Sequence, residues 1–445
     1  MSDLLSIGAT GVRAYQTALT TTSENIANAG TVGYSRRTTN FNEVAAPSTN
    51  SKVTNGLGVV VDGVTRASDI YRSAEVRTSG SDLARSEAGA TWLDRIDGAL
   101  SGNKLGDRLT AFFTSTKAIA ADPSALAPRA TTLEAAQSVA TAFSATGAAL
   151  SAAASDLDAS ADSAVTQLNG FSAALAKVNA GLSRSQAGSA ASSALLDQRD
   201  QILESMSAIT DVSVSFDSIG RATVKAGGDG GPTIVQGVDS ATVTYVRNDQ
   251  GAVSFAAHFG NTISALSPNG GALAGYADGA QKIAAAQGQL NDQAQAFADG
   301  VNAVQAAGVD LNGNPGQPIF QVGDPPSNLT MVLNDPRGIA AAAPGAGTRD
   351  NSNLAGFDTL RATGNVEGAI TDMTAANGAA LAAKQNVAQA QGAIHDTAVA
   401  ARDSVSGVNI DEEAVDLMRF QQAYQASSRV IQVARDTFQS ILNIG

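Results

Sequence analysis

The apolar positions near the C-terminus form one unbroken helical stripe. They recur in alternating steps of three and four residues, with a single serine among them: Leu417, Phe420, Tyr424, Ser427, Ile431, Ala434, Phe438 and Ile441. This spacing places all of them on one face of a helix and predicts a seam that must be buried. A second apolar row on the same helix offers further contact surface: Val415, Met418, Val430 and Val433.

The N-terminal segment repeats this pattern more weakly. Its seam consists of Leu5, Ala9, Val12, Leu19 and Ile26, with interruptions at Gln16 and Ser23. The helix is predicted to stop at Gly30, because glycine is a natural C-terminal helix signal. Two short seams at opposite ends of one chain predict antiparallel pairing of the two terminal helices.

Neither terminal seam is rich enough to hold its helix alone. A fully buried large apolar side chain contributes ~1.5–3 kcal/mol, whereas ordering roughly 30 residues costs ~1–2 kcal/mol for each backbone unit. We therefore expect both ends to fray in the free monomer and to order against neighbouring copies. An ordinary two-helix hairpin that caps a monomeric bundle remains the alternative, and the pattern alone does not separate the two.

Long helices are predicted through most of the interior. They cover residues 69–100, 128–182, 195–209, about 271–304 and 366–405, and Pro128 suits a first helical turn. The second of these repeats apolar or small residues over seven heptads, which is typical of a coiled coil. The last has a predicted seam of Val366, Ile370, Met373, Ala380, Val387, Ile394 and Val405.

Two segments have the pattern of extended chain. Residues 30–67 alternate in places and contain Gly and Pro breaks. Residues 211–266 contain short β-type runs, V-S-V-S-F, A-T-V-K-A, T-I-V-Q, A-T-V-T-Y-V and A-V-S-F-A, with turns at 227–231 and 248–251. The second segment therefore reads as a small β domain inserted between helices.

These elements predict a mainly α fold: an elongated, discontinuous multi-domain rod with coiled-coil-like helices from both chain ends and a small inserted β domain. The predicted domains are 1–35 with 408–445 (terminal helices), 36–210 with 267–407 (long-helix shaft) and 211–266 (β insert). Because halves from both ends of the chain pack around a central insertion, both termini should lie at one end of the rod.

Composition and charge narrow the possible partners. The net charge of −13 and the scarcity of adjacent basic residues argue against nucleic-acid binding. Arg36 and Arg37 are the adjacent basic pair, and a solvated loop is the expected setting for them. The start of the chain lacks a basic and apolar secretory signal, and no apolar run is long enough for membrane insertion.

No catalytic, cofactor-binding or metal site is predicted, and the protein is not expected to be an enzyme. There are no cysteines and only two histidines, His258 and His395. The chain therefore has too few ligands for a thiolate or His-based metal site and no cysteine for a Cys/His catalytic dyad. The Asp310-x-Asn312-x-Asn314 run fits a turn better than a calcium loop, because Pro315 stands where the loop needs glycine. Asn409 and Glu412 are expected to form a capping box. The acidic residues 411–413 are assigned to capping and to the helix dipole.

The segment from Ser23 to Arg36, S-E-N-I-A-N-A-G-T-V-G-Y-S-R, resembles the N-terminal signature of bacterial flagellar axial proteins, which include rod, hook and hook-associated proteins. Glu24 and Val32 depart from the usual Asn and Pro. The matching motif residues are Asn25, Ile26, Ala27, Asn28, Gly33 and Tyr34.

The C-terminal segment, Ser406 to Ala434, is most similar to that of the hook-associated protein 1 family. Its Asp-Glu-Glu-Ala precedes Gln-Gln-Ala-Tyr-Gln-Ala-Ser, in which the motif residues are Gln421, Gln422, Tyr424 and Gln425. Two internal stretches agree with this resemblance: L-L-D-Q-R-D-Q-I-L at 195–203 and G-V-D-L-N-G-N-P-G-Q-P-I-F at 308–320. Residues 211–266 carry no family signature.

The resemblance implies a structural protein of the bacterial flagellum that joins hook to filament. It implies export through the flagellar type III channel without a cleaved signal peptide, and an extracellular location. Implied partners are further copies of the chain in a ring, the hook protein, the third hook-associated protein, and a cytoplasmic export chaperone on the C-terminal helix. The assembly seam would be Leu5, Val12, Leu19, Ile26, Leu417, Phe420, Tyr424, Ile431, Phe438 and Ile441. The alternatives are a flagellar hook or rod protein, or a secreted coiled-coil adhesin or effector.

Overall fold

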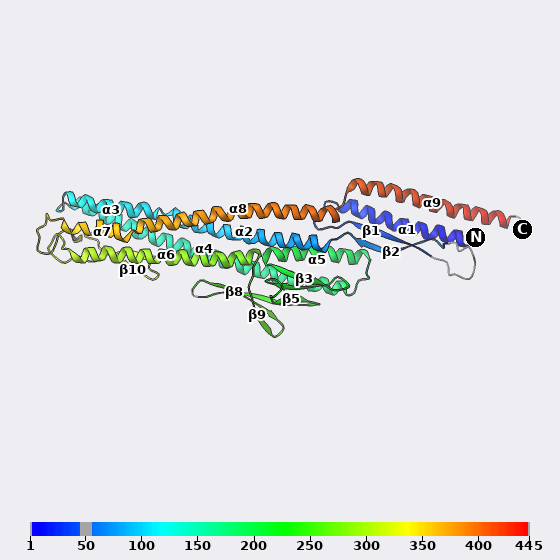
Figure 1. Ribbon diagram of the computed structural model, residues 1–445, viewed down its shortest axis with the longest axis horizontal. Helices are drawn as coiled ribbons and strands as arrows, with labels where there is room; N and C mark the ends of the chain where they lie inside the picture. The colour runs from blue at the N-terminus through cyan, green and yellow to red at the C-terminus, as the bar shows by residue number, and fades with distance from the viewer. Residues whose placement is uncertain (1, 45–55, 249, 444–445) are drawn as a thin grey trace.

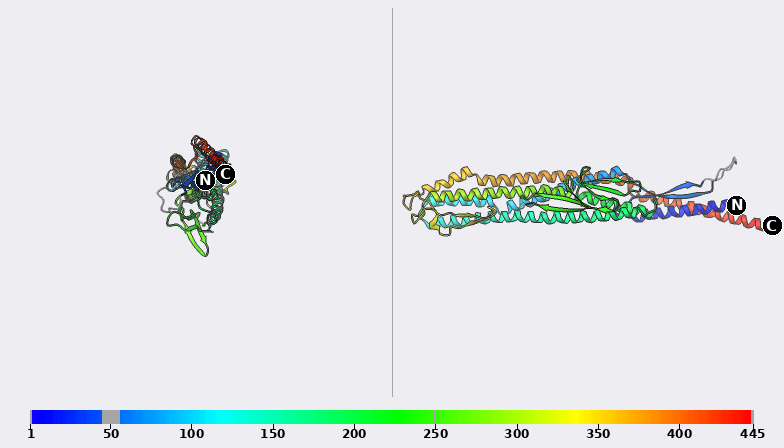
Figure 2. Two further views of the ribbon diagram at one scale, coloured as in Figure 1. Left: turned by 90° about the vertical axis from the view of Figure 1, so that its right-hand side faces the viewer. Right: turned by 90° about the horizontal axis from the view of Figure 1, so that it is seen from below.

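The computed structural model describes residues 2–44, 56–248 and 250–443 as a long rod (Figure 1). Its helices are α1 (Ser2–Asn28), α2 (Ile70–Gly102), α3 (Leu105–Ala121), α4 (Leu126–Leu182), α5 (Ala190–Ile209), α6 (Gly271–Ala307), α7 (Ala355–Gly364), α8 (Val366–Ser406) and α9 (Ile410–Leu442). Helices α2, α4, α6 and α8 run side by side, while α1 and α9 project from one end with both termini (Figures 1 and 2). The predicted mainly α rod with both termini at one end is confirmed.

Helix α4 spans the length predicted from its heptads. It has 57 residues and begins two residues before Pro128, which lies in its first turn. Most of the predicted seam is buried: Leu133, Ala136, Ala140, Phe143, Leu150, Leu157, Ala161, Ala164, Leu168, Leu175, Val178 and Leu182. Large and small residues alternate along this face, which lets neighbouring helices approach closely.

A phenylalanine cluster fills the far end of the shaft. Phe297 of α6 lies with its ring centroid 5.4 Å from that of Phe112 in α3, 6.0 Å from Phe143 in α4 and 5.2 Å from Phe320. Ring pairs at such distances add to the stability gained by burial. The cluster joins segments from distant parts of the sequence at the end opposite to the chain termini.

Two helices are not predicted by the sequence pattern. Helix α3 follows α2 after a short break at Asn103 and Lys104, where Lys104 adopts a left-handed backbone with φ of 51°. Helix α7 has 10 residues and follows a proline-rich stretch, 315–344, whose pattern predicts loop. Helix α7 is too short for its apolar face to repeat, whereas the 17-residue α3 has a helical apolar pattern, Leu105, Leu109, Phe112 and Phe113, that was missed.

Helix α5 also begins earlier than predicted. The serine- and glycine-rich break ends at Ser189, whose side chain accepts a hydrogen bond from the Ser192 N–H at 3.1 Å and caps the helix. The helix therefore starts at Ala190 rather than Leu195, because the serines at its start supply a cap.

The seam predicted for α8 is wrong in its C-terminal half. Val366 and Ile370 are buried, but Val387, Ile394 and Val405 are exposed. Helix α8 instead turns a small and polar face toward α2: the Asn377 side chain donates to Leu93 O at 3.0 Å, and His395 Nδ1 lies 3.2 Å from Ser79 Oγ. The face of α8 that meets α2 therefore carries small and polar residues, and the large apolar residues of its C-terminal half lie outside this contact.

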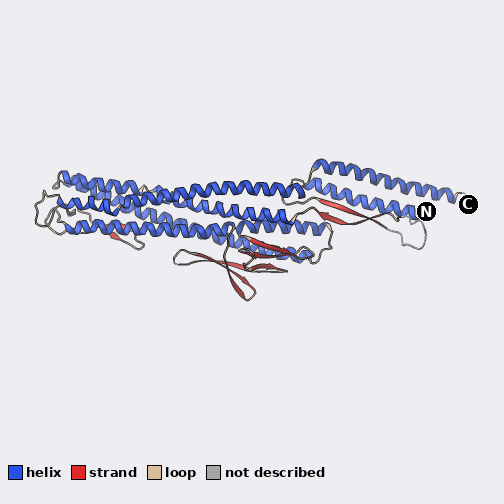
Figure 3. Cartoon of the chain, viewed as in Figure 1, coloured by secondary structure: helices blue, strands red, loops and turns tan. Residues whose placement is uncertain are grey.

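The strands predicted between 211 and 266 are confirmed, with two more in addition. β3 (Val212–Phe216), β4 (Ala222–Ala226), β5 (Thr233–Gln236) and β6 (Asp239–Ser240) form one antiparallel sheet. β7 (Thr242–Arg247), β8 (Val253–Phe259) and β9 (Thr262–Leu266) form another. Figure 3 shows them on one side of the helices. The Asn179 side chain of α4 fixes the first sheet, since it donates to Ala222 O and Gly237 O, both at 2.8 Å.

Two further strand pairs lie outside the β insert. β1 (Arg37–Glu43) pairs antiparallel with β2 (Val59–Arg66) and packs beside α1, while residues 45–55 of the predicted extended segment lie outside the described part. β10 (Phe320–Val322) pairs with β11 (Leu329–Met331). The turn predicted at Asp310 is confirmed, because its Oδ1 accepts the N–H groups of Asn312 and Asn314, both at 2.8 Å. In the described part of the chain, no helix is long and apolar enough to cross a membrane.

Candidate assembly interface

Helices α1 and α9 form an antiparallel pair that approaches closely at two glycines. A methyl group built on Gly8 would lie 2.7 Å from Ile431 Cγ1, and one on Gly11 would lie 2.7 Å from Ser427 Oγ. The most buried line of α1 is accordingly small or polar: Gly8, Gly11, Ala14, Ala18, Thr21, Thr22 and Asn25. The lack of large side chains on this line lets the two backbones come together.

The predicted seam residues lie around this contact, with differing exposure. Leu5, Val12, Leu19 and Ile26 of α1 and Leu417, Phe420, Tyr424 and Ile431 of α9 are all half-buried. Phe438 and Ile441 are 52% and 54% exposed, because α9 extends beyond the start of α1 (Figure 1). Of the predicted α9 seam, Ser427 and Ile431 lie against Gly11 and Gly8 of α1 and Phe420 lies against Tyr15, while the last turns are uncovered.

An aromatic cluster ties the β1–β2 hairpin to the helix pair. The Tyr15 ring of α1, the Phe41 ring of β1 and the Phe420 ring of α9 have centroids 5.7–6.4 Å apart. Helix α1 packs chiefly against α9, β1 and β2. The terminal pair is thus a projecting unit, and it does not cap the core of the bundle.

The adjacent arginines do not lie free in a solvated loop, contrary to the prediction, because both are paired with acidic residues. Arg36 Nε donates to Glu413 Oε1 at 2.6 Å, and this hydrogen bond raises the pKa of Arg36. Arg37 Nη2 donates to Asp197 Oδ2 of α5 at 3.2 Å, and its side chain is almost completely buried. One arginine therefore binds the terminal helix pair and the next binds the shaft.

We call the contacts of Arg36 and Arg37 between the terminal helix pair and the shaft the joint. Asn25, which was named only as a motif residue, lies at its centre. Its Nδ2 donates to Arg37 O at 2.8 Å and to Glu413 Oε2 at 2.9 Å. Its Oδ1 accepts from Tyr34 Oη at 2.9 Å and from the Arg37 N–H at 3.0 Å. Burial raises the pKa of Tyr34 to about 12, so its hydroxyl remains a donor. Asn25 is fully buried and uses its full hydrogen-bonding capacity.

The start of α9 differs in part from the predicted cap. Asn409 Oδ1 accepts from the Asp411 N–H at 3.0 Å, which confirms the N-cap. Glu412, expected to complete a capping box, lies toward Arg36 with its Oε2 3.8 Å from Nη1. Glu413 is only 2% exposed and is the carboxylate shared by Arg36 and Asn25, so a purely dipole role is wrong for it.

Charged residues of α5 complete the joint on the shaft side. Asp197 lies between Arg37 and Arg66, with Oδ1 2.7 Å from Arg66 Nε. Asp200 binds both Arg66 and Arg199. Burial raises the pKa of Asp197 despite the two arginines. Sequence reasoning missed this network, although its signal was present: D-Q-R-D interrupts an apolar helix at 197–200.

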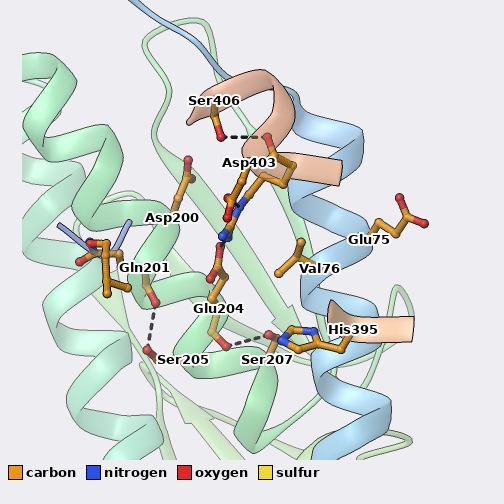
Figure 4. A network of polar contacts seen from close by, with 12 residues as sticks. Glu75, Val76, Asp200, Gln201, Glu204, Ser205, Ser207, His395, Asp403 and Ser406 are labelled. Carbon is orange, nitrogen blue, oxygen red and sulfur yellow. Dashed lines mark hydrogen bonds and ion pairs between the residues drawn. The ribbon is translucent and has the colours of Figure 1, made fainter. Parts of the chain in front are cut away.

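The end of α8 is held in the same place. Arg402 Nη1 donates to Glu204 Oε1 of α5, and Arg402 Nε donates to Asp403 Oδ1 at 2.9 Å. Figure 4 shows Glu204 and Asp403 facing one another across this contact, with Asp200 and Gln201 nearby. Gln201 Nε2 donates to Val32 O at 2.6 Å. A polar hollow of about 750 Å³ lies among these residues, between the terminal pair and the shaft.

This arrangement is suited to mechanical connection. Ion pairs and hydrogen bonds fix the direction of the terminal pair relative to the shaft, while the outer face of α9 is left exposed. Among the residues that the structure describes, no group of His, Asp and Glu side chains is placed to hold a metal ion.

Comparison with known families agrees with this geometry. The family model for the flagellar hook-associated protein FlgK helical domain matches residues 92–320, just over half of the chain. The chain belongs to the FlgK family of flagellar hook-associated proteins. It is therefore a structural flagellar protein, and this assignment replaces the alternatives of a hook or rod protein and of an adhesin or effector. The C-terminal model of the basal body rod FlgEFG proteins matches residues 402–444.

Similar proteins cover the whole length of the chain. Flagellar hook-associated protein 1 of Escherichia coli is 24% identical over 100% of both chains. That of Bacillus subtilis is 25% identical over 97% of this chain and 96% of its own. The hook protein FlgE of Brucella abortus is 30% identical over 23% of this chain and 28% of its own.

A solved structure supports the fold. The flagellar hook junction protein FlgK from Burkholderia pseudomallei matches with a TM-score of 0.50 and 24% identity, over 56% of this chain and 47% of that one. Over the matched part, this FlgK family chain has the same fold as that protein.

Proposed function

We propose that this protein forms the junction between the flagellar hook and the filament, and that it polymerises as a ring through its paired terminal helices. The observation that carries the proposal is the exposed apolar surface on α9. Val415, Met418, Val430, Val433, Phe438 and Ile441 are exposed on a helix whose inner face already packs against α1. Exposed apolar surface of this extent is typical of an interaction site.

The proposed assembly seam keeps the residues named from the sequence. Leu5, Val12, Leu19, Ile26, Leu417, Phe420, Tyr424 and Ile431 hold the pair together, and Phe438 and Ile441 reach neighbouring copies. The proposed motif roles follow the contacts. Asn25 and Tyr34 form the joint, and the remaining motif residues lie in the segments that it connects.

The roles that we propose for the three domains follow the domain boundaries predicted from the sequence. Residues 1–35 with 408–445 would line the inside of the tubular assembly. Their boundary with the shaft lies where Arg36 and Ser406 meet, because the Arg36 N–H donates to Ser406 O at 2.8 Å. Residues 36–210 with 267–407 form the shaft, and residues 211–266 form an outward β insert on one side of it.

The flagellar location of the family, outside the cell, fits this function. We propose that the chain leaves the cell unfolded by the flagellar type III route without a cleaved signal peptide. Hook protein would lie below the ring and the third hook-associated protein above it. A cytoplasmic export chaperone would cover the C-terminal helix before export, which is consistent with the apolar residues that α9 leaves exposed.

A deletion strain tests the proposal. Cells without the gene should build hooks, lack filaments and release flagellin monomers into the medium, and the intact gene should restore filaments. Leu417→Asp and Ile431→Asp should fail to restore them, because a charge in the seam is costly to bury. Normal filaments in the deletion strain would refute the proposal.

A further inference from the structure

Helix α8 carries an apolar stripe beside its contact with α2. Its positions recur in alternating steps of four and three residues: Ala376, Ala380, Ala383, Val387, Ala390, Ile394, Thr397 and Ala401. They lie one residue before the row that includes Asn377 and His395, which contact α2, and so about 100° around the helix from it. Val387 is 45% and Ile394 is 54% exposed. An apolar heptad stripe that stays exposed in the single chain is typical of a surface that a second chain covers.

The β7–β9 sheet turns an uncharged face away from the shaft. Val243, Phe255 and Leu266 are buried on its inner face. The alternate positions of the three strands form the outer face: Thr242, Thr244, Val246, Ser254, Ala256, His258, Ile263 and Ala265. Asp, Glu, Lys and Arg are absent from these positions. Ile263 is 67% exposed and lies near the tip of the β8–β9 hairpin, which projects from the shaft (Figures 1 and 2).

The two surfaces lie at the same level along the rod. Gly270, which follows β9, lies against Ser81 of α2, and the neighbouring Gly80 of α2 lies against His395 of α8. Figure 1 shows α8 along the top of the rod and β9 on the lower side, below the middle of α8. Two copies that stand side by side in the same direction can therefore bring the hairpin of one to α8 of the other.

We infer that the β8–β9 hairpin of one copy packs on the exposed stripe of α8 in the next copy around the ring. Ile263 of one copy lies beside Val387 and Ile394 of the next. The inference rests on the proposed function and adds a contact made by the shaft and the β insert. Because the two surfaces lie at one level on opposite sides of the rod, successive copies need a rotation and no displacement along the ring axis. A head-to-tail contact of this kind can close into a ring.

Charge favours a second copy as the occupant of the stripe. The chain has a net charge of −13, so two copies repel each other over much of their surfaces. The stripe and the outer sheet face contain no Asp, Glu, Lys or Arg. Two copies can meet there without bringing like charges together. A partner that is recognised by charge would find no acid or base on either surface.

The contact is too small to hold two chains together alone. Three strands about 4.8 Å apart, with roughly six residues each at about 3.3 Å, present an area of about 280 Å². Stable interfaces bury about 800 Å² on each partner. The contact should therefore form only where the terminal pairs already hold the copies side by side. Its role is to stiffen the ring, and filaments should still form without it.

The absence of native cysteines allows a direct test by crosslinking. Ile263→Cys/Ile394→Cys is expressed in the deletion strain, hook–filament complexes are isolated, and a short bismaleimide is added. A ladder of multimers is expected, because the cysteine introduced at position 263 of one copy meets the cysteine introduced at position 394 of the next. Co-expression of the two single variants should give dimers and no longer species, because each chain then has one cysteine.

The controls test whether the crosslink reports this contact. Ile263→Cys/Arg108→Cys should remain monomeric, because Arg108 is exposed on α3 at the far end of the shaft. Purified Ile263→Cys/Ile394→Cys in dilute solution should also remain monomeric. Monomers from complexes of both Ile263→Cys/Ile394→Cys and Ile263→Cys/Val387→Cys would overturn the inference.

Resistance to shear supplies a second readout. Ile263→Asp and Ile394→Asp each place a carboxylate against an apolar surface, so cells with either variant should build filaments but lose at least about twofold more of them under a fixed shear. Val238→Asp, on an exposed apolar residue between β5 and β6, is the matched control. Shear losses equal to those of the control in both variants would contradict the contact.

These experiments separate the inference from the function on which it rests. If filaments depend on the gene but neither cysteine pair crosslinks, the junction role stands and the contact between the hairpin and α8 is wrong. If filaments form without the gene, the junction role itself is wrong.

Discussion

The buried carboxylate of Glu413 accepts a hydrogen bond from Arg36 at 2.6 Å and links two segments 377 residues apart in sequence. Its other oxygen accepts from Asn25, so α1, the following extended segment and α9 meet at one side chain. The next residue, Arg37, binds Asp197 on the shaft. This pair of arginines makes the connection between the terminal helices and the shaft specific in direction.

Removal of the Glu413 charge should loosen the terminal pair. Arg36 and Asn25 each donate a hydrogen bond to a separate oxygen of the Glu413 carboxylate. Glutamine has only one acceptor oxygen, and its NH₂ group is a donor. In Glu413→Gln one of the two buried donors therefore loses its acceptor. We expect a loss of about 2 kcal/mol, below the usual cost for a fully buried pair because Arg36 is partly exposed. Hydrogen exchange of α9 backbone amides should become about 30-fold faster. Glu412→Gln, on an exposed neighbour, is the control and should change exchange little.

Substitution of the glycines at the helix crossing should force α1 and α9 apart. Gly8→Val adds atoms where Ile431 lies, and such overpacking costs about 1–3 kcal/mol. Trypsin should then cleave faster after Arg13, which is exposed on α1. Gly98→Ala, in open space on α2, should have the opposite effect and raise thermal stability, by about 1 kcal/mol. Equal cleavage rates in Gly8→Val and the unmodified protein would contradict the close crossing.

The hydroxyl of Tyr34 should contribute a pH-dependent part of the joint's stability. Tyr34→Phe removes the donor to Asn25 Oδ1, at a cost of about 1 kcal/mol. Because the folded-state pKa of about 12 lies above the usual value of 10.0, this contribution is full below pH 10 and is lost as the pH rises through 12. The difference in urea midpoint between the two proteins should shrink accordingly. A difference that is constant across this range would contradict the role of the hydroxyl.

The long periodic elements could be predicted from sequence, and the joint could not. Helix α4 repeats its pattern over many turns, so single exceptions such as Gly147 do not obscure the period. Most of the buried face of this helix is apolar, so a hydrophobic pattern is enough to find it. The strands at 212–266 were recognisable for the same reason, because β-branched residues alternate between turns that contain glycine.

The polar contacts depend on residues that sequence proximity does not reveal. The sequence predicted a solvated loop for Arg36 and Arg37 because their partners, Glu413 and Asp197, lie 377 and 160 positions away along the chain. The α8 seam failed because Asn377 and His395 pair with α2, which a hydrophobic pattern cannot show. The prediction that both ends fray in the free monomer stays a prediction.

The central claim is that the uncovered end of α9 is an assembly surface, and filament formation by a surface variant tests it most directly. Phe438→Asp/Ile441→Asp changes residues that are already exposed in the single chain, so the monomer should fold and be exported normally. Ile263→Asp, on an exposed apolar residue of β9, is the matched control. In the deletion strain, electron microscopy should show hooks without filaments for the α9 variant and normal filaments for the control. Normal filaments with the α9 variant would contradict the account.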